Sequence, residues 1–139
     1  KPGGSIINIS APQAVVAMTG QAHVCAAKAG VDMITKTLAL EWGPEGIRIN
    51  SVIPGPIEDT EGMRRLAPTP QAMDAVVKSV PLKRIGQNSD MANICLFLGS
   101  EMASYVNGTV IPVDGGWYLN MPGTALDPVI DMHPEEKQK

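Results

Sequence analysis

Lys28 is the residue of this chain whose surroundings point most clearly to chemistry. Its neighbours Ala26, Ala27, Ala29 and Gly30 are small and apolar. Small residues let a helix pack closely against another element, so the pattern favours a sheltered amine. The alternative is a solvated amine, which is usual for a lysine on an amphipathic helix. A sheltered ammonium group is a candidate contact for a bound ligand.

The residues around Lys28 bear on proton transfer. Val24 lies one helical turn before Lys28, and residues four apart share a helix face. A valine side chain cannot give a proton to a substrate or take one from it. His23 and Cys25 flank Val24 but do not lie on the face of Lys28, and we expect His23 to be a surface or packing residue.

Composition excludes several classes of function. The 139 residues are 44% apolar and 18% charged, which predicts one domain that buries much of its surface, in part against other subunits. A net charge of −3 provides no basic surface for nucleic acid. No apolar run approaches the ~20 residues that span a membrane, and no signal peptide is visible. We therefore expect neither a nucleic-acid nor a membrane partner.

The two cysteines, Cys25 and Cys95, lie far apart in helix-like segments and lack metal-ligand spacing. We expect free thiols in a reducing compartment and no metal site. The chain ends in Glu135-Glu136-Lys137-Gln138-Lys139, which is not the Ser-Lys-Leu peroxisomal address. These features predict a cytoplasmic protein.

Hydrophobic patterns predict strands that alternate with helices. Strands are expected over 5–10, 47–53 and 109–113, where β-branched residues are frequent. Residues 11–20 are expected to form a loop. A long helix is predicted for Ala22–Trp42, because apolar residues recur there at helical spacing, at Val24, Ala27, Val31, Ile34, Leu38 and Trp42.

The segment 58–80 is rich in charges and prolines, and it contains two short helical runs, 61–66 and 71–79. It is either a mobile cover over a pocket or an ordinary surface excursion. A further helix is predicted to begin at Ser89 or Asp90 and to end between Leu98 and Ser100.

This order of elements predicts an α/β fold of the Rossmann type, in which helices flank a parallel sheet. Three strands are few for such a sheet, and no Gly-rich turn joins an early strand to a helix, so the phosphate-binding half is missing. We expect only the C-terminal three-strand part of the domain in residues 1–120, followed by an irregular tail over 121–139. An incomplete chain is the favoured explanation, and a free-standing half-domain is the alternative.

Five segments, in order and at matching spacing, resemble the short-chain dehydrogenases/reductases. They are Ala26–Val31, Leu38–Gly43, Gly46–Val52, Pro54–Ile57 and Val113–Gly116. The resemblance covers about residues 4–120 and implies the last three strands of a seven-stranded sheet. The positions of the family's catalytic tyrosine and serine hold Val24 and Ala11 here.

The resemblance also implies roles for particular residues. Lys28 would hold the nicotinamide ribose hydroxyls, and the backbone of Pro54, Gly55 and Ile57 would meet the nicotinamide carboxamide. Thr60 would touch the cofactor's phosphate or amide, although capping of a turn is nearly as good an explanation.

One branch of the family, the peroxisomal-type 2,4-dienoyl-CoA reductases, lacks both the serine and the tyrosine. The chain resembles this branch in the ungapped run from Pro54 to Leu66, Pro-Gly-Pro-Ile-x-x-Thr-Glu-Gly-x-Arg-Arg-Leu. The resemblance implies NADPH-dependent reduction of a conjugated dienoyl-CoA in fatty-acid metabolism, with NADH left open. It implies a catalytic carboxylate at Asp114, unless that aspartate has a structural role.

Arg64 and Arg65 are candidate contacts for the phosphates of a coenzyme A ester. The alternative is a solvated helix face that they form with Glu61. Two other functions remain open, an alcohol or ketone oxidoreductase with altered catalytic residues and a non-catalytic half-domain. The family resemblance implies a homo-oligomer, usually a tetramer, with the Ala22–Trp42 helix as its packing face.

Overall fold

The computed structural model describes residues 3–120. The tail expected over 121–139, and with it the predicted boundary after residue 120, lies outside the described residues. Within them, three strands form one parallel sheet in the order β1-β2-β3. The strands are β1 (Gly4–Ile9), β2 (Ile47–Pro54) and β3 (Val110–Val113), each within one or two residues of its predicted position. The predicted parallel α/β architecture is confirmed.

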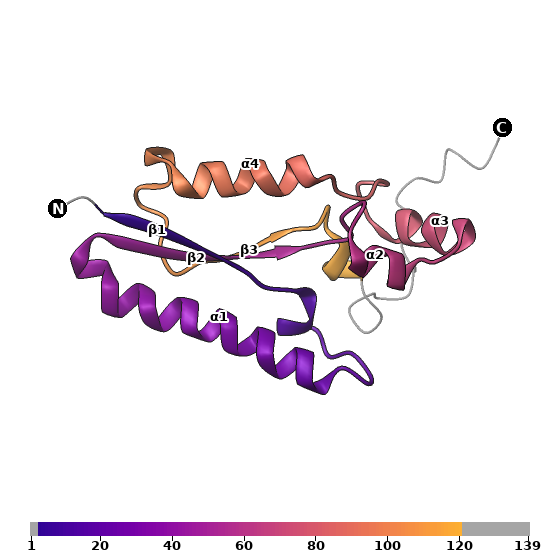
Figure 1. Ribbon diagram of the computed structural model, residues 1–139, viewed down its shortest axis with the longest axis horizontal. Coiled ribbons are helices and arrows are strands. Elements are labelled where there is room, and N and C mark those ends of the chain that lie inside the picture. Colours follow the sequence, from indigo (N-terminus) through magenta and orange to yellow (C-terminus); the bar gives the residue numbers. More distant parts are fainter. Residues whose placement is uncertain (1–2, 121–139) are drawn as a thin grey trace, which may run out of the picture.

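Helices cover both faces of the sheet. In Figure 1, α1 (Ala22–Trp42) lies along one face and α4 (Asn88–Gly99) along the other. The short helices α2 (Glu61–Leu66) and α3 (Pro70–Ser79) lie beyond the end at which the strands finish. Single 3-10 turns, η1 (Pro12–Ala14), η2 (Gly43–Glu45), η3 (Glu101–Ala103) and η4 (Trp117–Asn120), occur in the connections. A central parallel strand covered in this way must be buried, and residues 49–53 of β2 are.

The contact between the sheet and α4 is apolar. Val52, Leu98 and Ala103 are fully buried there, and Ile7 and Ile111 pack against them. Arg48 stabilises this layer at the C-terminal end of α4, because its guanidinium group donates to the carbonyl oxygens of Leu98, Ser100 and Val106. These bonds satisfy carbonyl groups where α4 ends and the chain turns toward β3.

The contact between the sheet and α1 is polar, which the sequence pattern did not predict. The buried residues of α1 are Asp32, Thr35 and Ala39, whereas Ile34 of the apolar series is 54% exposed. Ser51 donates a 2.7 Å hydrogen bond to Asp32 Oδ1, and Asn8 donates a 2.8 Å bond to Thr35 Oγ1. The helix is therefore where it was predicted, but Ala27, Ile34 and Trp42 of the apolar series are exposed. Polar side chains on the sheet select polar partners on the helix.

The loop after β2 lies directly on the turn after β3. A Cβ atom placed on Gly55 would come within 2.6 Å of both Cα and Cβ of Asp114. The Gly55 amide N–H also donates to the Val113 carbonyl oxygen at 3.0 Å. Only a glycine permits this approach, so Gly55 fixes the loop against the end of β3.

We predict that Gly55→Ala lowers the free energy of unfolding by about 1–3 kcal/mol, because the added methyl group overlaps backbone atoms that cannot move aside. Chemical denaturation of the intact natural protein measures the change. Gly99→Ala is the matched control, since a Cβ there meets no atom within 4 Å. Equal stability of the two variants would show that the contact of Gly55 with Asp114 is not tight.

Candidate active site at the carboxyl ends of the strands

A cleft of about 570 Å³ opens where the strands end. One side is formed by the segment after β1, another by the loop after β2 and by α2, and a third by the start of η4. Ligands of open parallel sheets bind at this end. The residues that line the cleft are Ser10, Ala11, Pro12, Gln13, Met18, Gln21, Pro54, Gly55, Pro56, Ile57, Thr60, Gly62, Met63, Arg65, Leu66 and Trp117.

Several predicted ligand-binding residues come together in this cleft. Its lining includes Pro54, Gly55, Ile57, Thr60 and Arg65. The lining also includes Ala11, the position of the absent serine, so the cleft has a methyl group where a hydroxyl was expected. The structure places the other predicted residues, Lys28, Arg64 and Asp114, near the cleft but not in its lining.

Lys28 lies at the end of β1, next to two residues of the cleft lining. Its half-buried side chain donates a 2.9 Å hydrogen bond from Nζ to the carbonyl oxygen of Ile9, the last residue of β1. The next two residues, Ser10 and Ala11, line the cleft. An ammonium group has three donors, so this bond fixes Lys28 at the end of the sheet and leaves donors for a ligand.

Thr60 caps α2. Its Oγ1 accepts a 3.2 Å hydrogen bond from the Met63 amide and donates a 2.8 Å bond to the Ile57 carbonyl oxygen. Both bonds join the loop after β2 to the first turn of the helix. The hydroxyl of Thr60 therefore has a structural task whether or not it also contacts a ligand.

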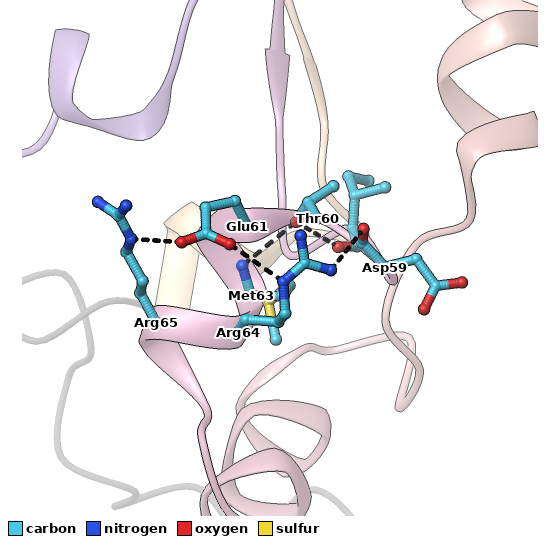
Figure 2. A network of polar contacts seen from close by, with 7 residues as sticks. Asp59, Thr60, Glu61, Met63, Arg64 and Arg65 are labelled. Carbon is cyan, nitrogen blue, oxygen red and sulfur yellow. Dashed lines mark hydrogen bonds and ion pairs between the residues drawn. The ribbon is translucent and has the colours of Figure 1, made fainter.

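Arg64 and Arg65 share one carboxylate. In Figure 2 they lie on either side of Glu61, and their Nε atoms donate to its two oxygens at 3.1 and 2.8 Å. Arg64 also donates to the Asp59 carbonyl oxygen at 3.3 Å. All three side chains are well exposed, so these ion pairs contribute little to stability and an anionic ligand can compete for the guanidinium groups.

Asp114 organises the turn that follows β3. Its Oδ1 accepts from the Gly116 amide and its Oδ2 from the Tyr118 amide, both at 2.8 Å. The Trp117 amide bonds to the Asp114 carbonyl oxygen at 3.1 Å. Each carboxylate oxygen therefore already accepts one backbone hydrogen bond.

A second hollow, of about 450 Å³, lies on the other side of the loop after β2, and Asp114 lines it together with Arg84 and Asp90. Arg84 makes a two-pronged contact with Asp90, at 2.7 and 3.1 Å. Hydrogen bonds from Arg84 and from the Gln87 amide lower the pKa of Asp90 to about 2. Asp90 thus stays ionised at neutral pH, and its bond to Gln87 caps the start of α4.

Sequence reasoning did not identify the apolar lining of the cleft. Met18, Met63, Leu66 and Trp117 face it. A signal was present for Met63 and Leu66, because residues three apart share one face of a predicted helix. No local pattern marked Met18 or Trp117, whose positions depend on how the chain folds back after η1 and after β3.

Other kinds of site are not evident in the described part of the chain. No group of three or more His, Cys, Asp or Glu side chains converges there as a metal site would require. Between residues 3 and 120, no helix has the length and the apolar character needed to cross a bilayer.

Comparison with known proteins identifies the family of this chain. The model of the family described as enoyl-(acyl carrier protein) reductase matches residues 1–118. The chain is 45% identical over 120 residues to a peroxisomal 2,4-dienoyl-CoA reductase [(3E)-enoyl-CoA-producing] of Pongo abelii, covering 86% of this chain and 41% of that protein. It is 47% identical over 121 residues to a probable 2,4-dienoyl-CoA reductase [(2E)-enoyl-CoA-producing] of Bacillus subtilis, covering 86% and 48%.

Solved structures agree with the fold. A gluconate 5-dehydrogenase from Burkholderia cenocepacia, in complex with NADP and tartrate, superposes with a TM-score of 0.76 at 36% identity, over 83% of this chain and 45% of that one. The chain thus spans less than half the length of the relatives it matches. The matched family model, the identities and the shared fold together show that the chain belongs to the enoyl-(acyl carrier protein) reductase family of short-chain dehydrogenases/reductases.

Proposed function

We propose that the protein to which this chain belongs reduces a conjugated 2,4-dienoyl-CoA thioester with NADPH. The observation that carries the proposal is the composition of the cleft. The lining combines apolar side chains with a loop suited to a nicotinamide, and the described lining holds no tyrosine and has Ala11 in place of the serine. A cleft of this kind suits a flat hydrocarbon chain better than a ketone, which needs a hydroxyl to orient it and an acid to protonate it. The names of the relatives support the same substrate.

The proposed reaction consumes one hydride and one proton. The nicotinamide, when bound, supplies the hydride, which adds to carbon 5 of the diene. The electrons move toward the thioester and form an extended enolate, and a proton then adds at carbon 2 or carbon 4. The product is an enoyl-CoA with one double bond, and the oxidised cofactor leaves. No alkoxide forms, so Val24 in place of a tyrosine is compatible with this chemistry.

The loop after β2 is suited to hold a nicotinamide carboxamide. Among residues 3–120, none of the backbone hydrogen bonds of this loop uses the Ile57 N–H, whereas the Gly55 N–H is bonded to Val113. We assign the Ile57 amide and the backbone of Pro54 and Gly55 to the carboxamide. Thr60 fixes the loop to α2 and is assigned to the cofactor's amide or phosphate. The preference for NADPH over NADH is part of the proposal, as is the assignment of the ribose hydroxyls to Lys28.

A coenzyme A ester brings phosphate groups to the exposed side of the cleft. Arg65 lines the cleft, and Arg64 lies on the same short helix. Both guanidinium groups are exposed, and both form an ion pair with the Glu61 carboxylate. We assign both to the substrate's phosphates, with Arg65 as the nearer of the two.

Asp114 is proposed to assist proton delivery, in addition to holding its turn. The backbone and Cβ of Asp114 lie against Gly55, so this residue adjoins the loop that carries the nicotinamide contacts. Its two backbone hydrogen bonds hold the carboxylate in one orientation. Delivery of a proton from water near this carboxylate would require no tyrosine.

A second candidate is an alcohol or ketone oxidoreductase, which the similarity to a gluconate 5-dehydrogenase favours. A non-catalytic half-domain is a third. The exposed apolar side chains of α1, Met33, Ile34 and Leu40, support the proposal that this helix packs against another subunit of a homotetramer. The cytoplasmic location stays a prediction, because the relatives include peroxisomal enzymes.

Steady-state rates separate the two enzymatic candidates. The intact natural protein is supplied with NADPH and either a 2,4-dienoyl-CoA or a ketone of similar size, and the loss of NADPH absorbance is followed. We expect turnover of the dienoyl-CoA and little reaction with the ketone. Ketone reduction without dienoyl-CoA reduction would favour the second candidate, and inertness toward both would favour the third.

Lys28→Ala is predicted to weaken cofactor or transition-state binding by about 1.5–3 kcal/mol, because a charge-assisted contact to the ribose is lost. The measurement is kcat/KM with NADPH varied. Lys36→Ala on the same helix is the control, since Lys36 is exposed and remote from the end of β1. If the two variants behave alike, Lys28 is only a structural donor to Ile9.

Asp114→Ala is predicted to lower kcat more than it raises KM, as expected when a group that acts in proton delivery is removed. Thermal melting monitors the turn, because the same change removes two backbone hydrogen bonds. Full activity of a folded Asp114→Ala variant would show that Asp114 only stabilises its turn.

Val24→Tyr is predicted not to create ketone reduction, because Ala11 still lacks the hydroxyl that would orient a carbonyl. It should instead lower dienoyl-CoA turnover by crowding the space beside Lys28. Rates with both substrates measure this, and strong new ketone reduction would contradict the dienoyl-CoA assignment.

A further inference from the structure

The proposed function leaves one anchored aromatic residue without a role. We propose that Trp117 forms the wall that ends the acyl slot and thereby sets the preferred chain length of the substrate. The inference rests on the proposed reduction of dienoyl-CoA thioesters and concerns the same cleft.

Several large apolar side chains line the cleft. Met63 and Leu66 from α2, Met18 from the segment before α1, and Trp117 line it together. Met63 is almost fully buried, at 3% exposure, whereas Leu66 is 50% exposed. Arg65 lies between Met63 and Leu66 in sequence and also lines the cleft. The cleft therefore offers an apolar lining for a hydrocarbon chain and a cation for an anionic group of the same ligand.

Trp117 is held in place at its polar edge. Its indole Nε1–H donates a 3.0 Å hydrogen bond to the Ser79 Oγ at the end of α3. Ser79 in turn donates to the Val76 carbonyl oxygen at 2.7 Å, and the Ser79 carbonyl oxygen accepts from Asn120 at 3.1 Å. A tryptophan with its N–H bonded presents a large rigid surface at small entropic cost, because few torsions remain free.

The turn before Trp117 directs it back toward the cleft. Gly115 and Gly116 have positive φ angles of 64° and 85°, which side chains rarely tolerate. A Cβ on Gly115 would lie 2.8 Å from Val80. The Asp114 carboxylate bonds to the amides on both sides of Trp117. The reversal of the chain is thus fixed by the two glycines and the aspartate, and Trp117 is fixed with it.

A rigid wall at the end of the slot distinguishes acyl chains of different length, whereas a flexible wall adapts to them. Methionine side chains adapt to the chain they contact, whereas the anchored indole cannot move aside. Each methylene group that a hydrophobic site accepts or excludes changes kcat/KM by ~10-fold or more. We therefore expect Trp117 to dominate the choice between short and long acyl chains.

The test compares kcat/KM for dienoyl-CoA thioesters of six, ten and fourteen carbons in the intact natural protein. Trp117→Ala and Trp117→Leu should raise the ratio of long-chain to short-chain kcat/KM by ~10-fold or more, because the wall is removed or reduced. Trp117→Phe should keep the wild-type order of chain lengths, and Ser79→Ala should shift the ratio in the direction of Trp117→Ala. Trp42→Phe, on the outer side of α1, is the control and should leave the ratio unchanged. Unchanged ratios in folded Trp117→Ala and Trp117→Leu proteins would overturn the inference.

A binding measurement separates this inference from the proposed reaction. A saturated acyl-CoA, which cannot react, should change the tryptophan fluorescence by the same amount in the wild type and in Trp42→Phe, and by a smaller amount in Trp117→Phe. A change of wild-type size in Trp117→Phe would overturn the inference, whatever the catalytic rates. If the wild type fails to reduce dienoyl-CoA but shows the fluorescence change that depends on Trp117, the proposed reaction is wrong and the role of Trp117 in acyl-chain binding is supported.

Discussion

The contact between Gly55 and Asp114 is the constraint on which the site depends. It joins the ends of β2 and β3, so the loop that follows the buried central strand rests on the turn that follows the edge strand. From this junction the chain proceeds in one direction to Thr60 and α2, and in the other to Trp117. Two of the three sides of the cleft are therefore positioned by one close approach of two backbones, which a side chain at residue 55 would prevent.

The polar layer between α1 and the sheet has a related consequence. Because Asp32 and Thr35 bond to Ser51 and Asn8, the register of α1 on the sheet is specific, and Lys28, one turn before Asp32, lies at the end of β1. An apolar contact would tolerate a small slide of the helix, whereas buried hydrogen bonds do not. The same arrangement leaves much of the apolar surface of α1 exposed, where another subunit can cover it.

Much of the fold could be predicted from the sequence, because local patterns determine it. The helix over Ala22–Trp42 was predicted with both of its ends, since Gly43-Pro44 cannot continue it, and the strands were predicted from their β-branched runs. The face of α1 that meets the sheet could not be predicted, because it depends on partners in β1 and β2 that are distant in sequence. The loop residues Pro54, Gly55 and Ile57 were predicted at the correct end of the sheet. The capping bonds of Asp114 and the return of Trp117 to the cleft follow from tertiary geometry, which no spacing in the sequence encodes.

We propose that a cleft without the serine and tyrosine of its family acts on a carbon–carbon double bond instead of a carbonyl group. The position to which the hydride is transferred distinguishes these two reactions. The intact natural protein would be given NADPH deuterated at the transferring position and an equimolar mixture of a 2,4-dienoyl-CoA and a ketone of similar size, and the products would be examined by NMR. We expect one deuterium at carbon 5 of an enoyl-CoA that retains its thioester carbonyl. Deuterium on a carbinol carbon of a carbonyl substrate, with none transferred to the dienoyl chain, would contradict it.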